Sequence, residues 1–460
     1  MTKQAQLSVV ILAAGQGTRM KSKLPKVLHP IGGKPLLAHV IHTAAELASK
    51  NTIVVYGHGG EQVKQQLANE QVSWVEQAEQ LGTGHAVDQA RPDIEDDHII
   101  LVLYGDVPLI RTETLVDLVN ITDADTLALL TVHLDNPHGY GRIVRENGEI
   151  KRIVEQKDAT RDELAITEIN TGILAVQGKR LKGWLSRLEN NNAQGEYYLT
   201  DIIAMAVEDG CNVEATHPDS EDEVLGVNSR SQLAYLERVY QRQQAEALMV
   251  EGVTIIDPDR IDIRGKISVG KDVTLDINVI LEGDVHIEDD VYIGPNCVIR
   301  DSFIGQGVQM QAMCMIDNAR VGAKSLIGPY SRLRPGAVLQ GDNHIGNFVE
   351  VKNSVIGEGS KVNHLSYIGD TDMGAGVNIG AGTITANYDG ANKHRTVIGE
   401  RASTGSNSVL VAPVTLGDDA TIGAGSVISK DAPEGKLTLT RAKQITIDGW
   451  RRPQKKSADK

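Results

Sequence analysis

Apolar positions in residues 1–228 alternate between the patterns of buried strands and of helices. Residues 7–14 form a continuous apolar run, typical of a strand covered on both faces of a parallel sheet. Residues 35–48 show apolar side chains at helical spacing. Further strands are expected at 52–56, 72–75 and 98–103, and helices at 60–68 and 83–90. This alternation predicts an α/β doubly wound, Rossmann-like domain over 1–228, with ligands at the carboxyl ends of the strands.

Residues 229–251 contain neither glycine nor proline and are rich in helix formers. This composition predicts a single linker helix.

From about residue 252 to the end, aliphatic residues recur every six positions. One series runs through Ile263, Val269, Leu275, Leu281, Ile287, Ile293 and Ile299, and a second, four residues later, runs from Ile267 to Phe303. The phase slips and resumes at Val321 and again at Ile398. A period of six fits a three-sided coil with one repeat per side, so about 18 residues make one turn. We expect an aliphatic interior column, in agreement with an aromatic content of only 3%.

The six-residue period breaks between Ala381 and Thr396. An insertion into a solenoid emerges as a protruding loop, which is either a tolerated surface feature or part of a binding face.

The composition excludes some classes of function and indicates where the protein works. A net charge of −15 argues against a nucleic-acid-binding protein. Cys211, Cys297 and Cys314 lack metal-ligand spacing and fit reduced thiols. The first residues contain too short an apolar run for a signal peptide or a membrane span. We therefore expect a cytoplasmic protein without membrane insertion.

A glycine-rich turn follows the first apolar run and carries Gly15, Gly17, Arg19 and, slightly later, Lys26. Glycines allow backbone amides to approach phosphate oxygens, and the two cations supply positive charge. The turn is neither a Walker loop nor a dinucleotide fingerprint, because Met20 stands where the latter needs glycine. A plain strand–helix turn is the alternative.

Asp106 directly follows the expected strand 98–103. A carboxylate there is placed to hold a hard cation that bridges phosphates. Alternatively, the Asp106 carboxylate only caps the turn that follows.

Arg334 and Lys352 are separated by one full turn of the expected coil, and each comes one position after an inward aliphatic residue. They should stack on adjacent strands, where two like charges favour a bound anion between or beside them. Alternatively, Glu350 or solvent offsets the two positive charges, and no anion binds. His364 is expected to point away from the interior, either as a surface residue or as a base near neutral pH that Glu350 orients.

Several segments together resemble the family of bifunctional bacterial N-acetylglucosamine-1-phosphate uridylyltransferases and glucosamine-1-phosphate N-acetyltransferases. The resemblance covers essentially the whole chain and rests on AAGQGTRMKSKLPKVLHPIGGKPL, YGDVPL, EINTG, RLRPGA, GNFVEVKN, NHLSYIGD and NIGAGTITANYDGANK. It implies a uridylyltransferase domain at 1–228 and an acetyltransferase domain at 252–460 that is a left-handed parallel β-helix and assembles as a homotrimer.

For the first domain, the resemblance implies transfer of a uridylyl group from UTP with Mg²⁺. Arg19 and Lys26 would be catalytic and hold the triphosphate, and Asp106 and Asn228 would hold the metal. The residues implied for UTP and the UDP-sugar are Leu12, Ala13, Ala14, Gly15, Lys26, Gln77, Gly82, Thr83, Tyr104, Gly105, Asp106, Gly141, Glu155, Asn170 and Asn228.

For the second domain, the resemblance implies that His364 is the general base for acetyl transfer. The residues implied for glucosamine-1-phosphate are Arg334, Lys352, Tyr367, Asn378 and Lys393, and those for acetyl-CoA are Ala381, Asn387, Tyr388, Ser406, Ala424 and Arg441. The basic tail from Arg441 to Lys460 would then face the phosphates of coenzyme A. The stretch 401–404, Arg-Ala-Ser-Thr, departs from the family's bulky apolar pattern, and its small residues are expected to weaken packing near Ser406.

A second hypothesis keeps only the nucleotidyltransferase and makes the coil a structural or regulatory module. The set of polar residues around His364 favours the bifunctional enzyme, because a structural coil has no need of it.

Overall fold

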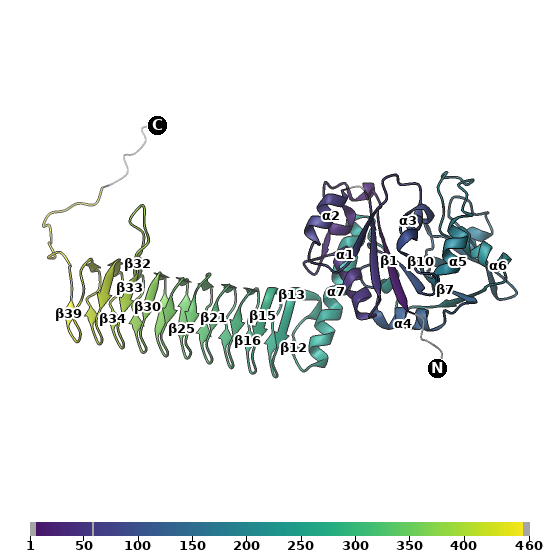
Figure 1. Ribbon diagram of the computed structural model, residues 1–460. Helices are drawn as coiled ribbons and strands as arrows, with labels where there is room; N and C mark the ends of the chain where they lie inside the picture. The colour runs from purple at the N-terminus through teal and green to yellow at the C-terminus, as the bar shows by residue number, and fades with distance from the viewer. Residues whose placement is uncertain (1–5, 58, 454–460) are drawn as a thin grey trace, which may run out of the picture. The chain divides into compact units, whose positions relative to one another are not determined.

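The computed structural model describes residues 6–57 and 59–453, so Lys455, Lys456 and Lys460 of the basic tail lie outside the described residues. The chain divides into two compact units, Met1–Gln244 and Ala245–Lys460 (Figure 1). The division falls within α7 (Arg230–Val250), so the helix predicted between the two patterns is present as one element. No helix in the described part of the chain combines the length and apolar character needed to cross a membrane.

The first unit is built on a nine-stranded sheet flanked by helices. The predicted strands are confirmed as β1 (Leu7–Ala13), β4 (Asn51–Tyr56), β5 (Ser73–Glu76) and β6 (Ile99–Tyr104). The predicted helices are α1 (Leu36–Glu46), α2 (Gly60–Gln66) and α3 (Thr83–Gln89). The apolar runs form the core because parallel strands are covered on both faces.

The sheet is mixed rather than wholly parallel. Its order is β11-β7-β10-β6-β1-β4-β5, with β7 at Thr126–His133, β10 at Glu168–Gln177 and β11 at Asn212–Thr216. β10 runs antiparallel to both of its neighbours and also pairs with β8 (Arg142–Glu146), which pairs with β9 (Glu149–Val154). The helices that complete this unit are α4 (Thr112–Asn120), α5 (Gly178–Leu185) and α6 (Asp201–Glu208).

The register of the central strands positions the first site. Leu12 of β1 lies opposite Tyr104 of β6 in a parallel pair. The two strands therefore end side by side, and the backbone amide of Gly105 donates a hydrogen bond to the Leu12 carbonyl (2.9 Å). The glycine-rich turn after β1 and the Asp106 loop after β6 consequently meet at one edge of the sheet.

The second unit is a parallel β-helix, whose rungs follow one another from β12 (Thr254–Ile255) to β39 (Leu437–Thr438) (Figure 1). Inward residues stack from rung to rung: Leu281 lies opposite Ile299, and Ile299 opposite Ile316. This register confirms the predicted three-sided turn, in which each side takes one repeat. The stacked side chains form one continuous aliphatic core.

The prediction that Phe303 belongs to the interior column is wrong. Phe303 is partly exposed, and its ring lies under the Arg320 guanidinium (3.8 Å from carbon to ring centroid). Ile304 takes the interior position instead. Ile299 and the next inward residue, Ile304, are five positions apart instead of six, a shorter step that recurs later in the coil, so the strict six-residue count misses Ile304.

The predicted insertion is a loop that projects from the coil, but it starts later than predicted: the chain first continues the coil through β32 (Ile384–Ala386) and leaves it only between β32 and β33 (Thr396–Ile398) (Figure 1). Across it, Met373 lies opposite Ile398, so the rungs on either side stack as if the insertion were absent. In the stretch 401–404, Ala402 and Thr404 are buried. The Thr404 hydroxyl accepts a hydrogen bond from the Gly380 amide (3.0 Å), so its polar atom is satisfied inside the coil.

Candidate active sites

A cavity of about 700 Å³ opens at the edge where β1 and β6 end. It is lined by most of the residues that the sequence assigned to the nucleotide: Leu12, Ala13, Ala14, Gly15, Arg19, Lys26, Gln77, Gly82, Thr83, Tyr104, Asp106 and Asn228. Its volume is in the range of small-molecule sites. Segments from residue 12 to residue 228 thus converge on one pocket.

Lys26 lies between the two proposed metal ligands. Its ammonium group forms an ion pair with the buried Asp106 carboxylate and donates a hydrogen bond to Asn228 Oδ1 (3.3 Å). Both side-chain oxygens therefore point at one place that already accommodates a cation. Carboxylate and amide oxygens are the ligands that Mg²⁺ prefers, so the two residues fit such an ion.

Gln77 is held rigidly at the cavity wall. Its amide nitrogen lies within hydrogen-bond distance of the Gly82 carbonyl (3.1 Å) and of His85 Nδ1 (3.0 Å). Gly82 has φ of 111°, and a Cβ there would lie 2.5 Å from the Tyr197 carbonyl oxygen. Only glycine therefore permits this closely packed wall.

The residues assigned to the sugar do not line this cavity. Asn170 and Gly141 are joined by a backbone hydrogen bond (2.9 Å). The nearby Glu155 lines a neighbouring cavity and accepts a hydrogen bond from Thr200 (3.1 Å). Burial raises the pKa of Glu155 above its ordinary value. These three residues lie together beside the pocket rather than in it.

Other cavity residues escaped the sequence assignment, among them Gln16, Gln80, Tyr140, Thr171 and Gly226. Tyr140 is partly buried; burial and the charge of Asp106 raise its pKa, and Arg19 lowers it. Gly226 approaches Asp106 closely, since a Cβ there would lie 3.5 Å from Oδ2. Tyr140 and Gly226 belong to short glycine-containing segments. This glycine content is the one feature of the sequence from which they could have been predicted as site residues.

Replacing Gly172 with alanine is expected to lower the free energy of unfolding by about 1–3 kcal/mol and to displace the Tyr104 ring from the cavity. Gly172 has φ of 88°, and an added Cβ would lie 2.4 Å from Tyr104 Cε2. Denaturant unfolding measures the loss. Gly183→Ala in α5 is the matched control, because nothing lies within 4 Å of a Cβ there. Equal stability of the two variants would contradict the predicted clash.

In the second unit, Arg334 and Lys352 lie on adjacent rungs of one wall, as predicted. Leu333 pairs with Val351, and the Arg334 amide donates to the Val351 carbonyl (2.9 Å). Glu350 forms a salt bridge with Arg334 (2.6 Å). Oε1 of Glu350 accepts this bond, and no hydrogen bond joins Glu350 to His364 among the described residues, so the orienting role of Glu350 stays a prediction.

Asp370, which sequence reasoning missed, organises the wall next to these cations. Burial opposes its ionisation, but the side-chain amides of Asn353 and Asn387 donate hydrogen bonds to its carboxylate. The ammonium groups of Lys352 and Lys393 also lie nearby, and together these groups lower the pKa of Asp370. The inserted loop therefore brings Asn387 and Lys393 onto the wall of Lys352.

The Lys352 ammonium also lowers the pKa of Lys393. Two cations this close favour an anion such as a sugar phosphate.

His364 is exposed and begins a row along the coil. The next members, one rung apart, are Ala381, Ser406 and Ala424. Backbone hydrogen bonds define the row, because the amide that follows each of these residues donates to the carbonyl of the member one rung before: Gly382 to His364 (3.1 Å), Asn407 to Ala381 (2.7 Å) and Gly425 to Ser406 (2.8 Å). Ala424 follows in the same row, and the Arg441 side chain lies beside Gly423 and Gly425. The histidine and four of the residues assigned to acetyl-CoA thus lie along one line.

Two assigned residues stand apart from these groups. Asn378 is exposed on the 11-stranded sheet. Of the other residues assigned to the sugar phosphate, Lys352 and Tyr367 are in strands of the 17-stranded sheet, and Arg334 directly follows one of its strands. Tyr388 is exposed in the inserted loop, where its hydroxyl donates to the Gly390 carbonyl (2.6 Å).

A cavity at the carboxyl edge of an α/β sheet, joined in one chain to a β-helix of six-residue repeats, defines a two-domain transferase. Residues 9–191 match the family of MobA-like NTP transferase domains. Residues 266–301 and 395–430 match the bacterial transferase hexapeptide family.

Relatives named bifunctional protein GlmU match nearly the whole chain. The protein of Marinobacter nauticus is 57% identical, over 98% of this chain and 99% of its own length. That of Methylococcus capsulatus is 59% identical, over 98% of both chains. That of Acinetobacter baumannii is 56% identical, over 97% of this chain and 99% of its own. The chain belongs to the GlmU family of bifunctional proteins.

Proposed function

We propose that this enzyme makes UDP-N-acetylglucosamine by two successive transfers. The second unit acetylates glucosamine-1-phosphate with acetyl-CoA, and the first unit couples the product to UTP with release of pyrophosphate. The observation that carries the proposal is the presence, in one chain of this family, of two separate polar sites: the cavity around Lys26 and Asp106, and the row that begins at His364.

In the acetyl transfer, the amine of glucosamine-1-phosphate attacks the thioester carbonyl carbon and the coenzyme A thiolate leaves. His364 takes the proton of the attacking amine, a task that suits imidazole near neutral pH. The sugar phosphate binds the cations of Arg334, Lys352 and Lys393. Acetyl-CoA lies along the row from Ala381 to Arg441, with its acetyl group toward His364.

In the uridylyl transfer, a phosphate oxygen of N-acetylglucosamine-1-phosphate attacks the α-phosphorus of UTP, and pyrophosphate leaves. Such a reaction needs in-line positioning and charge neutralisation rather than a protein nucleophile. Arg19 and Lys26 hold the triphosphate, and Gln77 and Thr83 hold the base. Mg²⁺, which Asp106 and Asn228 would hold, supplies further neutralisation of the phosphates.

The proposal extends to assembly and location. The family resemblance and the flat walls of the β-helix support a homotrimer, with each acetyl-CoA site shared between neighbouring subunits. Three free, buried cysteines among the described residues support a cytoplasmic location.

The proposal is tested by incubating the protein with UTP, Mg²⁺, glucosamine-1-phosphate and acetyl-CoA, and omitting one component at a time. Without acetyl-CoA, no N-acetylated product should form. With added N-acetylglucosamine-1-phosphate, UDP-sugar should form without acetyl-CoA but not without UTP. Formation of UDP-sugar alone, with no acetyl transfer under any condition, would contradict the bifunctional assignment.

A further inference from the structure

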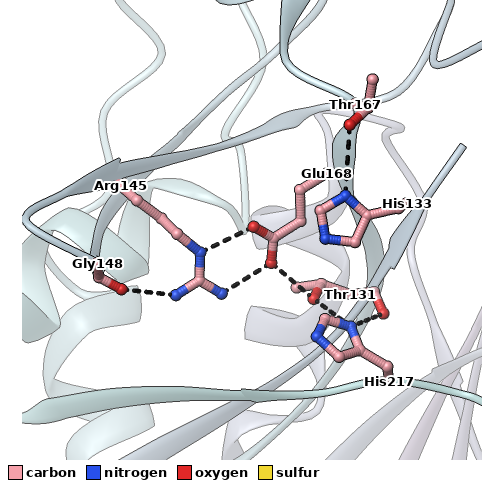
Figure 2. Close-up of polar contacts among 7 residues, drawn as sticks. All are labelled: Thr131, His133, Arg145, Gly148, Thr167, Glu168 and His217. Atoms are coloured by element: carbon pink, nitrogen blue, oxygen red, sulfur yellow. Dashed lines mark hydrogen bonds and ion pairs between the residues drawn. The ribbon is translucent and has the colours of Figure 1, made fainter.

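Two histidines and a glutamate lie together on β7, β10 and the end of β11, away from the cavity described above. His133 of β7 is directly opposite Glu168 of β10, so both side chains point to the same face of the sheet. The pairing of Thr216 with Leu130 continues to His217, which lies beside Thr131. Figure 2 shows both imidazole rings next to the Glu168 carboxylate.

The possible ligand atoms of His133, Glu168 and His217 all lie within 4.8 Å of one another. In a tetrahedral zinc site with bonds of about 2.0–2.1 Å, ligand atoms are about 3.4 Å apart. Both histidines are exposed while Glu168 is buried. Small rotations of the two exposed imidazole side chains would therefore bring three ligand atoms to bonding distance around the buried carboxylate.

The hydrogen bonds of the histidines leave the outer ring nitrogens available. Nδ1 of His217 lies 2.9 Å from the Thr131 carbonyl, which only accepts, so Nδ1 carries the proton and Nε2 has its lone pair free. Nδ1 of His133 lies 3.3 Å from the Thr167 hydroxyl. Within the described residues, neither Nε2 atom has a hydrogen-bond partner. A backbone carbonyl on the second ring nitrogen, as at His217, is one of the usual supports of a metal-binding histidine.

Glu168 is ionised and keeps room for one more positive group. Burial opposes ionisation, but hydrogen bonds from Arg145 and Thr131 outweigh it and lower the pKa of this carboxyl. Arg145 donates two hydrogen bonds and Thr131 one (2.8, 2.8 and 2.9 Å). A carboxylate offers about four acceptor positions; Oε1 already accepts two hydrogen bonds and Oε2 accepts one, so the remaining position is on Oε2. In Figure 2 the rings lie on the side of the carboxylate away from Arg145.

We propose that His133, His217 and Glu168 form a binding site for a divalent transition metal, with Zn²⁺ as the best match. Two imidazole nitrogens and one carboxylate oxygen are a common ligand set for zinc, and water at the exposed side completes the tetrahedron. Mg²⁺ does not suit the site, because it selects oxygen ligands. The site is thus chemically distinct from the oxygen pair of Asp106 and Asn228.

The test is zinc binding by the untagged full-length protein in competition with a chromogenic chelator. We expect one Zn²⁺ per chain at this site, and affinity at least about tenfold lower in His133→Gln and in His217→Gln. Co²⁺ should give the visible absorption of a tetrahedral complex with the wild type and lose it in both variants. His42→Ala is the matched control, because His42 is an exposed histidine of the same unit that contacts a single carboxylate, Glu70.

The control variant should keep wild-type zinc affinity. Equal zinc affinity of the wild type and of both glutamine variants would overturn the proposal, as would tighter binding of Mg²⁺ than of Zn²⁺ at the site. Because both histidines are exposed, the variants are expected to retain the circular dichroism and unfolding midpoint of the wild type.

Discussion

Replacing His364 with alanine is expected to lower acetyl transfer by about 10²–10⁴-fold and to leave uridylyl transfer unchanged. The substitution removes the one imidazole in the row along the coil, which is the proposed proton acceptor. The remaining members of that row are small residues and Arg441, whose guanidinium offers only hydrogen-bond donors. The measurement is the rate of each reaction with its own substrates on the same purified variant.

His344→Ala is the matched control for this experiment. His344 is on the same sheet of the β-helix and pairs with Lys361 of the rung that carries His364. The control should keep both activities. Loss of both reactions in a folded His364→Ala protein would contradict independent sites, and full retention of acetyl transfer would remove His364 from the mechanism.

Replacing Asp106 with alanine is expected to lower uridylyl transfer at least about a hundredfold and to spare acetyl transfer. The buried carboxylate is the only fully charged oxygen donor of the proposed metal pair, and it also positions Lys26 through their ion pair. Both effects remove charge neutralisation from the triphosphate. The measurement is pyrophosphate release from UTP and N-acetylglucosamine-1-phosphate over a range of Mg²⁺ concentrations.

Asp117→Ala provides the comparison for Asp106. Asp117 is an exposed carboxylate on α4, and its removal changes the net charge equally. Mg²⁺-dependent synthesis of UDP-sugar at the wild-type rate in the Asp106 variant would reject the proposed metal role.

The sequence by itself determined the two architectures and the core of the first site. The continuous apolar run of β1 and the six-residue period of the coil are local requirements, since each inward position needs an apolar side chain whatever its distant neighbours are. The glycine-rich turn and Asp106 were identifiable for a related reason: residues that directly follow parallel strands meet at the same edge of the sheet.

Only the tertiary structure decided which polar side chains pair. Glu350 contacts Arg334 rather than His364, and Asp370 accepts hydrogen bonds from Asn353 and Asn387. The exact offset between rungs determines these contacts. That offset is 18 residues at some rungs and 17 at others, and the shorter step between Ile299 and Ile304 places Phe303 outside the core. His133, Glu168 and His217 are far apart in the sequence and meet through strand pairing, which no short motif records.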